Sequence, residues 1–280
     1  MIFPDYHLHS EFSTDSTAPL SEIIASAKEK GLTSLCLTDH HDLDFPFFDK
    51  EGNREFQLDL QKYISKLNEL QNAQTPGFDI RIGVELGVMP SVTENANEFV
   101  KEYDSLDFII CSTHIVDGMD PYYPSYFEKY GEENGYRRYF EVILEALRGY
   151  TDFDVYGHLD YCVRYGPNKN KYYDPADYRD LFEEILKIII ESGRGIEINT
   201  GSLYRGLDVP HPHFELLKLY KELGGEIITV GSDAHTPDRI GYGFDVARDL
   251  LLAAGFTHYT TFKNRKPEFH PIPINPEEKQ

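Results

Sequence analysis

Short apolar segments alternate with longer amphipathic segments along most of the chain. The apolar segments have the length and composition typical of buried strands, and they occupy residues 5–9, 34–39, 80–86, 107–114, 154–158, 195–199 and 226–233. The segments between them place apolar residues at helical spacing, as in 21–31, 136–149 and 178–193, and several end at a glycine that suits a helix C-cap. The pattern predicts a repeated strand–helix unit, with a further helix at 246–256 and a last strand at 258–262.

The links between these elements differ in length. Helix-to-strand links are very short, whereas strand-to-helix links are long near residues 40–54, 115–133, 159–175 and 200–210. In an α/β barrel the long links lie at the C-terminal rim of the strands, where catalytic residues are carried. We therefore expect an α/β barrel that forms a single domain over residues 1–280, with the proline-rich residues 265–280 as a surface tail.

Composition narrows the class of protein. A chain of 280 residues and 32.3 kDa suits one large barrel domain. Its 27 basic and 48 acidic residues give a net charge of −21, which argues against binding to nucleic acid or to an anionic membrane. The first residues do not resemble a secretory signal and no apolar run reaches membrane-spanning length, so we expect a cytoplasmic protein.

Residues of metal-ligand type gather at the ends of the predicted strands. His7 and His9 are two positions apart at the end of the first strand, so both side chains point to one face. Each such residue taken alone is better explained as an ordinary polar or surface side chain. Together they predict one metal centre, because a closed barrel brings all strand ends to the same rim, whereas an open sheet joins only strands beside its switch point. The other residues of this type are Asp39, His40, His41, Glu85, His114, His158, Asp233 and His235.

These motifs resemble a known family. His7-Leu8-His9, Asp39-His40-His41, Gly157-His158 and the stretch 231–235 (GSDAH) are similar to the motifs of the PHP (polymerase and histidinol phosphatase) superfamily. The segments HLHSEFSTDS, STHIVDG, GHLDYCVRYG and INTGSLYRGL resemble its histidinol-phosphate phosphatase branch. The resemblance implies a distorted (β/α)7 barrel with a metal cluster at the C-terminal rim of the strands, holding two to three divalent transition metal ions.

The resemblance also implies which residues hold each ion. The first ion would take His7, His9, Glu85 and Asp233, and Glu85 would bridge to a second ion. That second ion would also take His114 and His158, and the third would take Asp15, His40 and His235. Mixed imidazole and carboxylate ligands suit Zn, Mn or Fe, and the sequence does not decide between them.

Two arginines indicate an anionic substrate. Arg164 and Arg205 lie on the long loops after the fifth and sixth predicted strands, where each can reach the rim. Surface salt bridges are the alternative, but cations beside a cationic metal cluster are best explained by an anion that joins them, and guanidinium binds phosphate through two prongs. The resemblance likewise places phosphate-binding arginines in these segments.

His41 is a further candidate for the site, as a phosphate contact or as the acid that protonates the leaving group. A group near Asp233 is the other candidate acid. His211 and His213 are expected in surface or capping roles.

The resemblance implies a metal-dependent phosphomonoesterase that hydrolyses L-histidinol phosphate to L-histidinol and phosphate in histidine biosynthesis. One alternative is a PHP-type phosphatase or nuclease acting on nucleotides or another small phosphoester. A zinc amidohydrolase is a second alternative, since its barrel also begins with His-x-His and ends with Asp, and a metal-stabilised interaction module is a third. The expected partner is a small phosphomonoester. The oligomeric state and the recognition of the substrate's imidazole and amine stay open.

Overall fold

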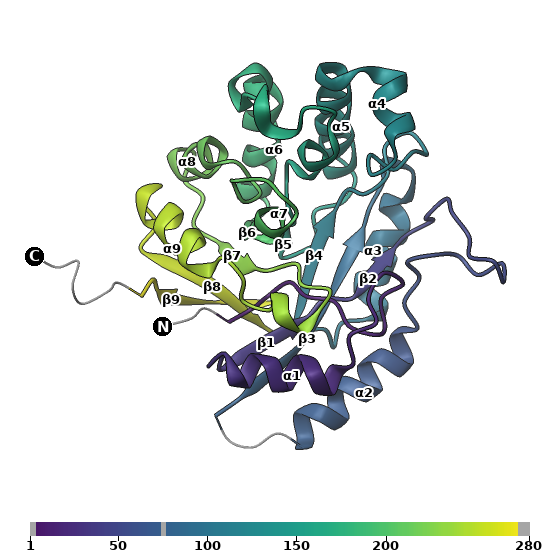
Figure 1. The fold of residues 1–280 in the computed structure, drawn as a ribbon, viewed down its shortest axis with the longest axis vertical. Helices are drawn as coiled ribbons and strands as arrows, with labels where there is room; N and C mark the ends of the chain where they lie inside the picture. Colours follow the sequence, from purple (N-terminus) through teal and green to yellow (C-terminus); the bar gives the residue numbers. More distant parts are fainter. Residues whose placement is uncertain (1–3, 74–76, 274–280) are drawn as a thin grey trace, which may run out of the picture.

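The computed structural model describes residues 4–73 and 77–273, which form a curled parallel sheet surrounded by helices (Figure 1). The sheet runs in the order β1-β3-β4-β5-β6-β7, and β2 pairs with β3 beyond the end of β1. Every pairing within it is parallel. The strands are β1 (Ser34–Leu37), β2 (His40–Asp42), β3 (Asp79–Gly87), β4 (Phe108–Ser112), β5 (Val155–Tyr156), β6 (Gly195–Asn199) and β7 (Ile228–Gly231).

The segment 5–9 closes the sheet into a barrel. It was expected to be the first strand, and it contains isolated parallel bridges, from Asp5 to Leu35 and from Leu8 to Ala234. Backbone hydrogen bonds run from this segment to residues of both β1 and β7, so it lies between the two edges of the sheet. The expected distorted α/β barrel is confirmed, and the distortion lies partly in this irregular closing segment.

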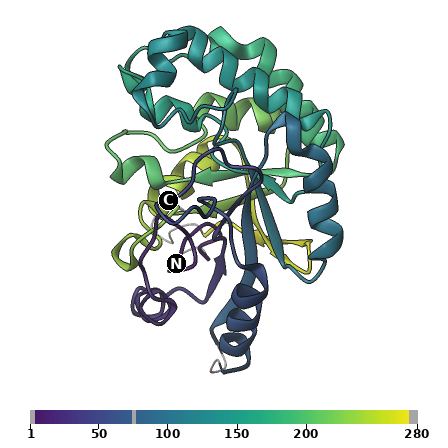
Figure 2. The ribbon, with the colours of Figure 1, turned by 90° about the vertical axis from the view of Figure 1, so that its right-hand side faces the viewer.

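Helices cover the outside of the barrel, and Figure 2 shows α5 and α6 side by side. In α5, Tyr136, Phe140, Ile143 and Leu147 are buried at a spacing that places them on one helical face. The α-helices are α1 (Leu20–Glu29), α2 (Leu60–Ala73), α3 (Thr93–Glu102), α4 (Pro124–Tyr130), α5 (Glu132–Leu147), α6 (Arg179–Glu191), α7 (Gly201–Tyr204), α8 (Phe214–Glu222) and α9 (Phe244–Ala253). Short 3-10 helices are η1 (Pro90–Val92), η2 (Tyr161–Tyr165), η3 (Lys169–Lys171), η4 (Pro175–Tyr178) and η5 (Pro237–Arg239).

Three of these helices were not predicted. Helix α2 was missed although its apolar residues recur at helical spacing, at Leu60, Tyr63, Ile64, Leu67 and Leu70, and pack on the core. Helices α4 and α7 lie inside the long strand-to-helix links. Within the described ranges, no helix is long and apolar enough to cross a membrane.

An antiparallel hairpin follows the barrel. Its strands are β8 (His258–Lys263), which confirms the predicted last strand, and β9 (Lys266–Pro271). Residues 265–280 were expected to form a surface tail; within them residues 266–271 form the paired strand β9, most of whose residues are exposed. Residues 274–280 lie outside the described residues. Phe262 of β8 packs in the barrel interior with Tyr6 and Phe108, and so closes the end opposite to the strands' C-terminal rim.

Candidate active site

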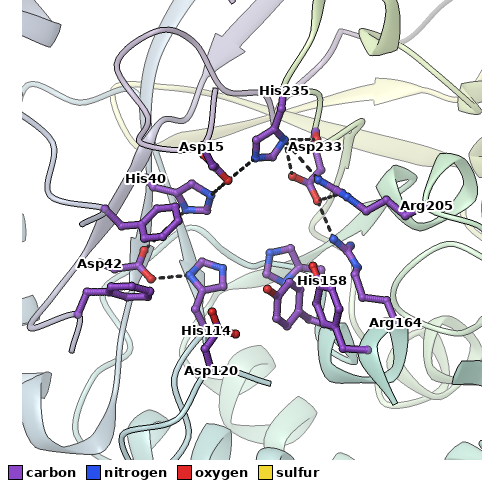
Figure 3. Close-up of a pocket in the computed structure, with 14 residues that line it drawn as sticks. Asp15, His40, Asp42, His114, Asp120, His158, Arg164, Arg205, Asp233 and His235 are labelled. Carbon is purple, nitrogen blue, oxygen red and sulfur yellow. Dashed lines mark hydrogen bonds and ion pairs between the residues drawn. The ribbon is translucent and has the colours of Figure 1, made fainter. Parts of the chain in front are cut away.

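Six of the nine expected metal ligands line one cavity at the C-terminal rim of the barrel, and His7, His9 and Glu85 are buried beneath it. The empty space in this cavity, including the part that is open to solvent, is about 440 Å³. Figure 3 shows Asp15, His40, His114, His158 and His235 pointing into it from different elements.

Backbone geometry at the rim sets the positions of two expected ligands, Asp233 and His7. Asp233, just after β7, has a positive φ of 54°, a conformation that aspartate tolerates better than most residues and that is often found at functional sites. Gly231 lies so close to the Cβ of His7 that any side chain there would clash. The backbone of β7 therefore approaches the closing segment closely enough to set the position of His7.

Glu85 of β3 lies at the centre of the cluster. Its Oε1 is 2.8 Å from His158 Nε2 and 3.2 Å from His114 Nε2. Its Oε2 is 3.0 Å from His40 Nδ1 and 3.1 Å from His7 Nε2. Burial opposes ionisation, but the surrounding imidazoles hold the pKa of this carboxyl well below its usual range. Each oxygen of one buried carboxylate thus faces a different set of histidines.

The atoms in this cluster are arranged as ligands rather than as hydrogen-bonding partners. His7 Nε2, His9 Nε2, His40 Nδ1 and Glu85 Oε2 are buried and make no hydrogen bond, although the three nitrogens lie 3.1, 3.5 and 3.0 Å from Glu85 Oε2. Ligand atoms about 2.0 to 2.1 Å from a tetrahedral ion are about 3.3 to 3.4 Å from one another. The residues therefore fit divalent metal ions. The groups able to hold an ion are His7-His9-Glu85, Glu85-His114-His158, His9-His40-His235 and His40-Asp42-His114.

Asp15 lies at the outer side of the cluster. It is close to His235 and His40, the other two residues of the third expected ligand set. Its Oδ2 is 2.9 Å from His235 Nε2 and 3.6 Å from His40 Nε2. The ring of His9 stacks between them, with its centroid 4.2 Å from that of each histidine. The structure thus brings Asp15, His40 and His235 together, with His9 as a neighbour that the expected set did not include.

Two arginines enter the cavity on the side of Asp233 (Figure 3). Arg164 lies in η2 after β5, and Arg205 follows α7 after β6. The Nη1 atoms of Arg164 and Arg205 lie 3.2 Å and 2.7 Å from Asp233 Oδ2. Arg164 is only 5% exposed, and its Nε and Nη2 are buried without a hydrogen-bond partner. A buried guanidinium with two unpaired nitrogens has N–H donors available for an anion in the cavity.

The sequence carries a recognisable domain. A family model described as "PHP domain" matches residues 5–201, which includes the closing segment and the strands through β6. The chain belongs to the PHP domain family.

Among relatives of this PHP-domain chain, a histidinol-phosphatase of Lactococcus lactis subsp. lactis is 33% identical over 94% of this chain and 95% of its own length. A probable histidinol-phosphatase of Clostridium acetobutylicum is 32% identical over 87% of this chain and 90% of its own. A crystal structure of histidinol phosphate phosphatase from L. lactis, complexed with Zn, L-histidinol and phosphate, has a TM-score of 0.83 and 30% identity; the match covers 95% of this chain and 98% of that one.

His41 does not join the other predicted residues of the PHP-domain site. In β2 successive side chains point to opposite faces, so His40 points into the cluster and His41 points away. Its Nδ1 accepts a hydrogen bond from the Leu58 amide at 3.2 Å, and its ring stacks on Phe99 at 5.1 Å. Burial lowers the pKa of His41 to about 4. The structure therefore corrects the hypothesis that His41 contacts phosphate or protonates the leaving group.

Two carboxylates of the site were not predicted. Asp42 Oδ2 lies 2.7 Å from His114 Nδ1, and Glu197 Oε2 lies 2.8 Å from His7 Nδ1, so each orients an imidazole through the ring nitrogen that faces away from Glu85. Sequence signals for both existed. Asp42 is two positions after His40 on the same strand face, and Glu197 is a lone charge within an apolar strand.

The two histidines that flank Pro212 have different roles in the structure. His213 caps α8, its Nδ1 accepting from the Glu215 amide at 3.3 Å, which confirms the expected capping role. His211 is 1% exposed, and its Nδ1 lies 2.6 Å from Asp160 Oδ1. It is therefore a buried, paired residue, and the expectation of a surface or capping role for it was wrong.

Proposed function

We propose that the protein is a metal-dependent phosphomonoesterase that hydrolyses L-histidinol phosphate to L-histidinol and phosphate in histidine biosynthesis. The observation that carries this proposal is the buried guanidinium of Arg164, whose Nε and Nη2 have no partner and which lines the cavity beside the carboxylate and imidazole cluster. A phosphoryl group can bind to the guanidinium and to the metal cluster at the same time, because its oxygens accept hydrogen bonds from arginine and also bind metal ions. The named activity of the relatives supports the same substrate.

The proposed cofactors are two to three divalent transition metal ions, of which Zn, Mn and Fe suit the ligands. We assign the first to His7, His9, Glu85 and Asp233, the second to Glu85, His114 and His158, and the third to Asp15, His40 and His235. When bound, such ions polarise phosphoryl oxygens and lower the pKa of coordinated water toward neutrality.

The chain's own residues hold and orient the phosphoryl group. Arg164 and Arg205 donate to its oxygens and stabilise the charge that moves toward the leaving group. Asp233 fixes both guanidinium groups, since its Oδ2 accepts from each. Asp233 Oδ1 also lies 3.5 Å from His9 Nε2, and since His41 faces away from the cavity, we propose that Asp233 or a group near it supplies the proton to the leaving alkoxide.

We further propose that residues 1–280 form a single domain and that the enzyme works in the cytoplasm. The proposed location agrees with the free state of Cys36, Cys111 and Cys162, which are all buried, because disulfides are rare in reducing compartments.

The experiment is a comparison of phosphate release from L-histidinol phosphate, nucleoside monophosphates and an aryl phosphate, measured as kcat/KM with metal-loaded enzyme. We expect L-histidinol phosphate to be the preferred substrate by at least about tenfold. A preference for nucleotides would instead favour the PHP-type nucleotidase. Amide hydrolysis that survives loss of both arginines would favour an amidohydrolase, and no turnover of any phosphoester would favour an interaction module.

A further inference from the structure

The loop that follows the proposed ligand His235 is fastened to helix α1. The short helix η5 in this loop lies against α1 (Figure 1). Ser26 of α1 donates from its Oγ to the Pro237 carbonyl at 2.6 Å. Asp15, which shares the third ion with His235 in the proposed assignment, lies in the link that leads into the same helix. The positions of two ligands of the third ion therefore depend on how the chain around them meets α1.

Lys30, at the C-terminal end of α1, makes three further contacts with this loop. Its Nζ donates to the backbone carbonyls of Asp238 at 2.6 Å, Ile240 at 2.8 Å and Pro237 at 3.4 Å. An ammonium has three N–H groups, so each carbonyl can take one of them. In the described ranges 4–73 and 77–273, no carboxylate forms an ion pair with this ammonium. The surroundings of Lys30 are therefore those of a cation bound by carbonyl oxygens and not those of a surface ion pair.

Three carbonyl oxygens that meet at one point need a positive charge between them. Such oxygens repel one another, and in proteins they surround bound cations such as K⁺. The Lys30 ammonium supplies this charge from within the chain. Beyond Ile240 the loop is held in another way, because the Gly241 amide donates to the buried Asp5 carboxylate at 2.9 Å. The contacts of Lys30 thus set the course of the chain between His235 and Ile240.

The third ligand set is the one that this support affects most. The side chains of Asp15 and His235 are 36% and 18% exposed, whereas the three expected ligands beneath the cavity are fully buried. Packing on all sides holds a buried ligand, while a ligand on a surface loop takes its position from the contacts of that loop. His235 therefore depends on the residues that hold the loop after it.

We propose that Lys30 acts as a built-in monovalent cation that positions His235 for the third metal ion. Its ammonium gathers the carbonyls of Pro237, Asp238 and Ile240, and so fixes the chain that leaves His235. Lys30 does not line the cavity, so it is a positioning residue that acts through a ligand. This inference rests on the proposed metal-dependent function and names the residue that supports the most exposed of the proposed ligand sets.

The test measures metal affinity, which does not depend on turnover. Metal-free enzyme is titrated with Zn²⁺, and Asp15→Asn identifies the ion of the third set as the one that it weakens. The variants are Lys30→Ala, Lys30→Met and, as a matched control, Lys101→Ala at an exposed lysine of α3. Each is titrated in ammonium chloride and in tetramethylammonium chloride at equal ionic strength. Alanine leaves room for an ammonium ion among the carbonyls, whereas methionine fills the space without a charge.

In tetramethylammonium chloride, both Lys30 variants should raise the Kd of the third ion by about tenfold to a hundredfold, as for other residues that orient a metal ligand, and change the other ions by less than about threefold. Ammonium should bring Lys30→Ala back to within about threefold of the parent, because it binds the same carbonyls, and should not restore Lys30→Met. Lys101→Ala should match the parent in both salts.

An unchanged third ion in Lys30→Ala would overturn the assignment, as would an equal weakening of every ion or a loss that ammonium does not reverse. If Lys30→Ala does not fold, Lys30→Met decides, since it keeps the alkyl stem and must still weaken the third ion alone. If Asp15→Asn weakens no ion, the third ligand set is wrong and the role of Lys30 is refuted with it. A parent that binds all its ions but releases phosphate from no phosphomonoester would refute the phosphatase function and leave the role of Lys30 intact.

Discussion

His211 and Asp160 form a buried pair, with Nδ1 and Oδ1 2.6 Å apart, that ties together the two loops carrying the arginines. Asp160 immediately precedes η2, which contains Arg164, while His211 follows the loop of Arg205 and is hydrogen-bonded to the backbone of β6. The second oxygen of Asp160 accepts from the His213 amide at 2.9 Å. The pair therefore fixes the separation between the loops from which both guanidinium groups project.

We expect Asp160→Asn to lower the free energy of unfolding by about 1 to 3 kcal/mol, because a charged hydrogen bond becomes a neutral one. The inhibition constant for inorganic phosphate should rise by about threefold to tenfold, since small displacements of binding groups weaken their joint contact. Urea unfolding and phosphate inhibition check the two effects. The exposed Asp177→Asn should change stability by less than about 0.5 kcal/mol. Reduced stability with unchanged phosphate inhibition would show that the pair serves folding alone.

At the opposite end of the barrel, Arg265 balances a buried carboxylate. Its Nε lies 2.5 Å from Asp154 Oδ2, and burial raises the pKa of Asp154 to about 6 although the guanidinium offsets part of the shift. This pKa is above the unfolded value of about 3.9, so the folded state binds the proton more tightly. The stability that Asp154 contributes is therefore present at low pH and falls as the pH rises through about 4 to 6.

We expect Arg265→Asn to cost about 1 to 3 kcal/mol at pH 8, because the buried Asp154 loses its nearer guanidinium and keeps only Arg194, whose Nη1 is 3.8 Å away, and clearly less at pH 5, where Asp154 takes up a proton. Asparagine suits the positive φ of 61° at this position, so backbone strain should not add to the loss. Urea unfolding at both pH values is the measurement. Arg239→Gln, at an exposed ion pair with Asp238, should cost under about 1 kcal/mol at either pH. Equal losses for Arg265→Asn at pH 5 and pH 8 would contradict this account.

Glu85 should be the ligand whose loss is most damaging, because its two oxygens face different sets of histidines. We expect the purified parent to contain two to three equivalents of transition metal and Glu85→Gln to lose at least one of them, with a drop in kcat/KM of at least about a hundredfold. Elemental analysis beside steady-state kinetics tests this, with the exposed Glu98→Gln as control. Normal metal content and rate in Glu85→Gln would refute the bridging role.

Much of this site could be predicted because strand ends obey simple geometry. The period of two puts His7 and His9 on one face, and the parallel barrel brings their neighbours from other strands to the same rim. Residues that act through backbone loops were harder to predict. Asp160 and His211 are far apart in sequence and meet only because two irregular loops fold against each other. Neither loop has a periodicity from which a direction can be read.

The prediction that His41 joins the site was wrong because it ignored the alternation of side chains along a strand. The predicted strand 34–39 places both histidines together just after its end, whereas β1 ends at Leu37 and a separate strand, β2, begins at His40. Within β2 the alternation is strict, so only one of two adjacent histidines can face the cavity. Adjacent residues on a strand cannot both be ligands of one centre unless the backbone turns between them.

We therefore expect His41→Gln to leave kcat/KM within about threefold of the parent. It should lower the free energy of unfolding by about 1 to 3 kcal/mol, because the stack on Phe99 and the bond from the Leu58 amide are altered. His40→Gln is the paired comparison, since its side chain faces Glu85, and it should lose metal and activity. A drop of a hundredfold or more for His41→Gln with normal metal content would restore His41 as a catalytic group.

The arginines separate a phosphatase from a metal-dependent hydrolase of another kind. If Arg164 and Arg205 hold phosphoryl oxygens whose charge changes during the reaction, replacing either by alanine should lower kcat/KM by about thirtyfold to a thousandfold, or about 2 to 4 kcal/mol. Metal content should stay normal, because neither side chain is a ligand. Lysine should restore only part of the rate, since it keeps the charge but not the planar pair of donors.

The exposed Arg179→Ala is the control. It breaks an ion pair with Glu183, and its kcat/KM should stay within about twofold of the parent. If Arg164→Ala and Arg205→Ala both stay within about threefold, the arginines do not bind the reacting phosphoryl group, because such a change is under 1 kcal/mol of transition-state stabilisation.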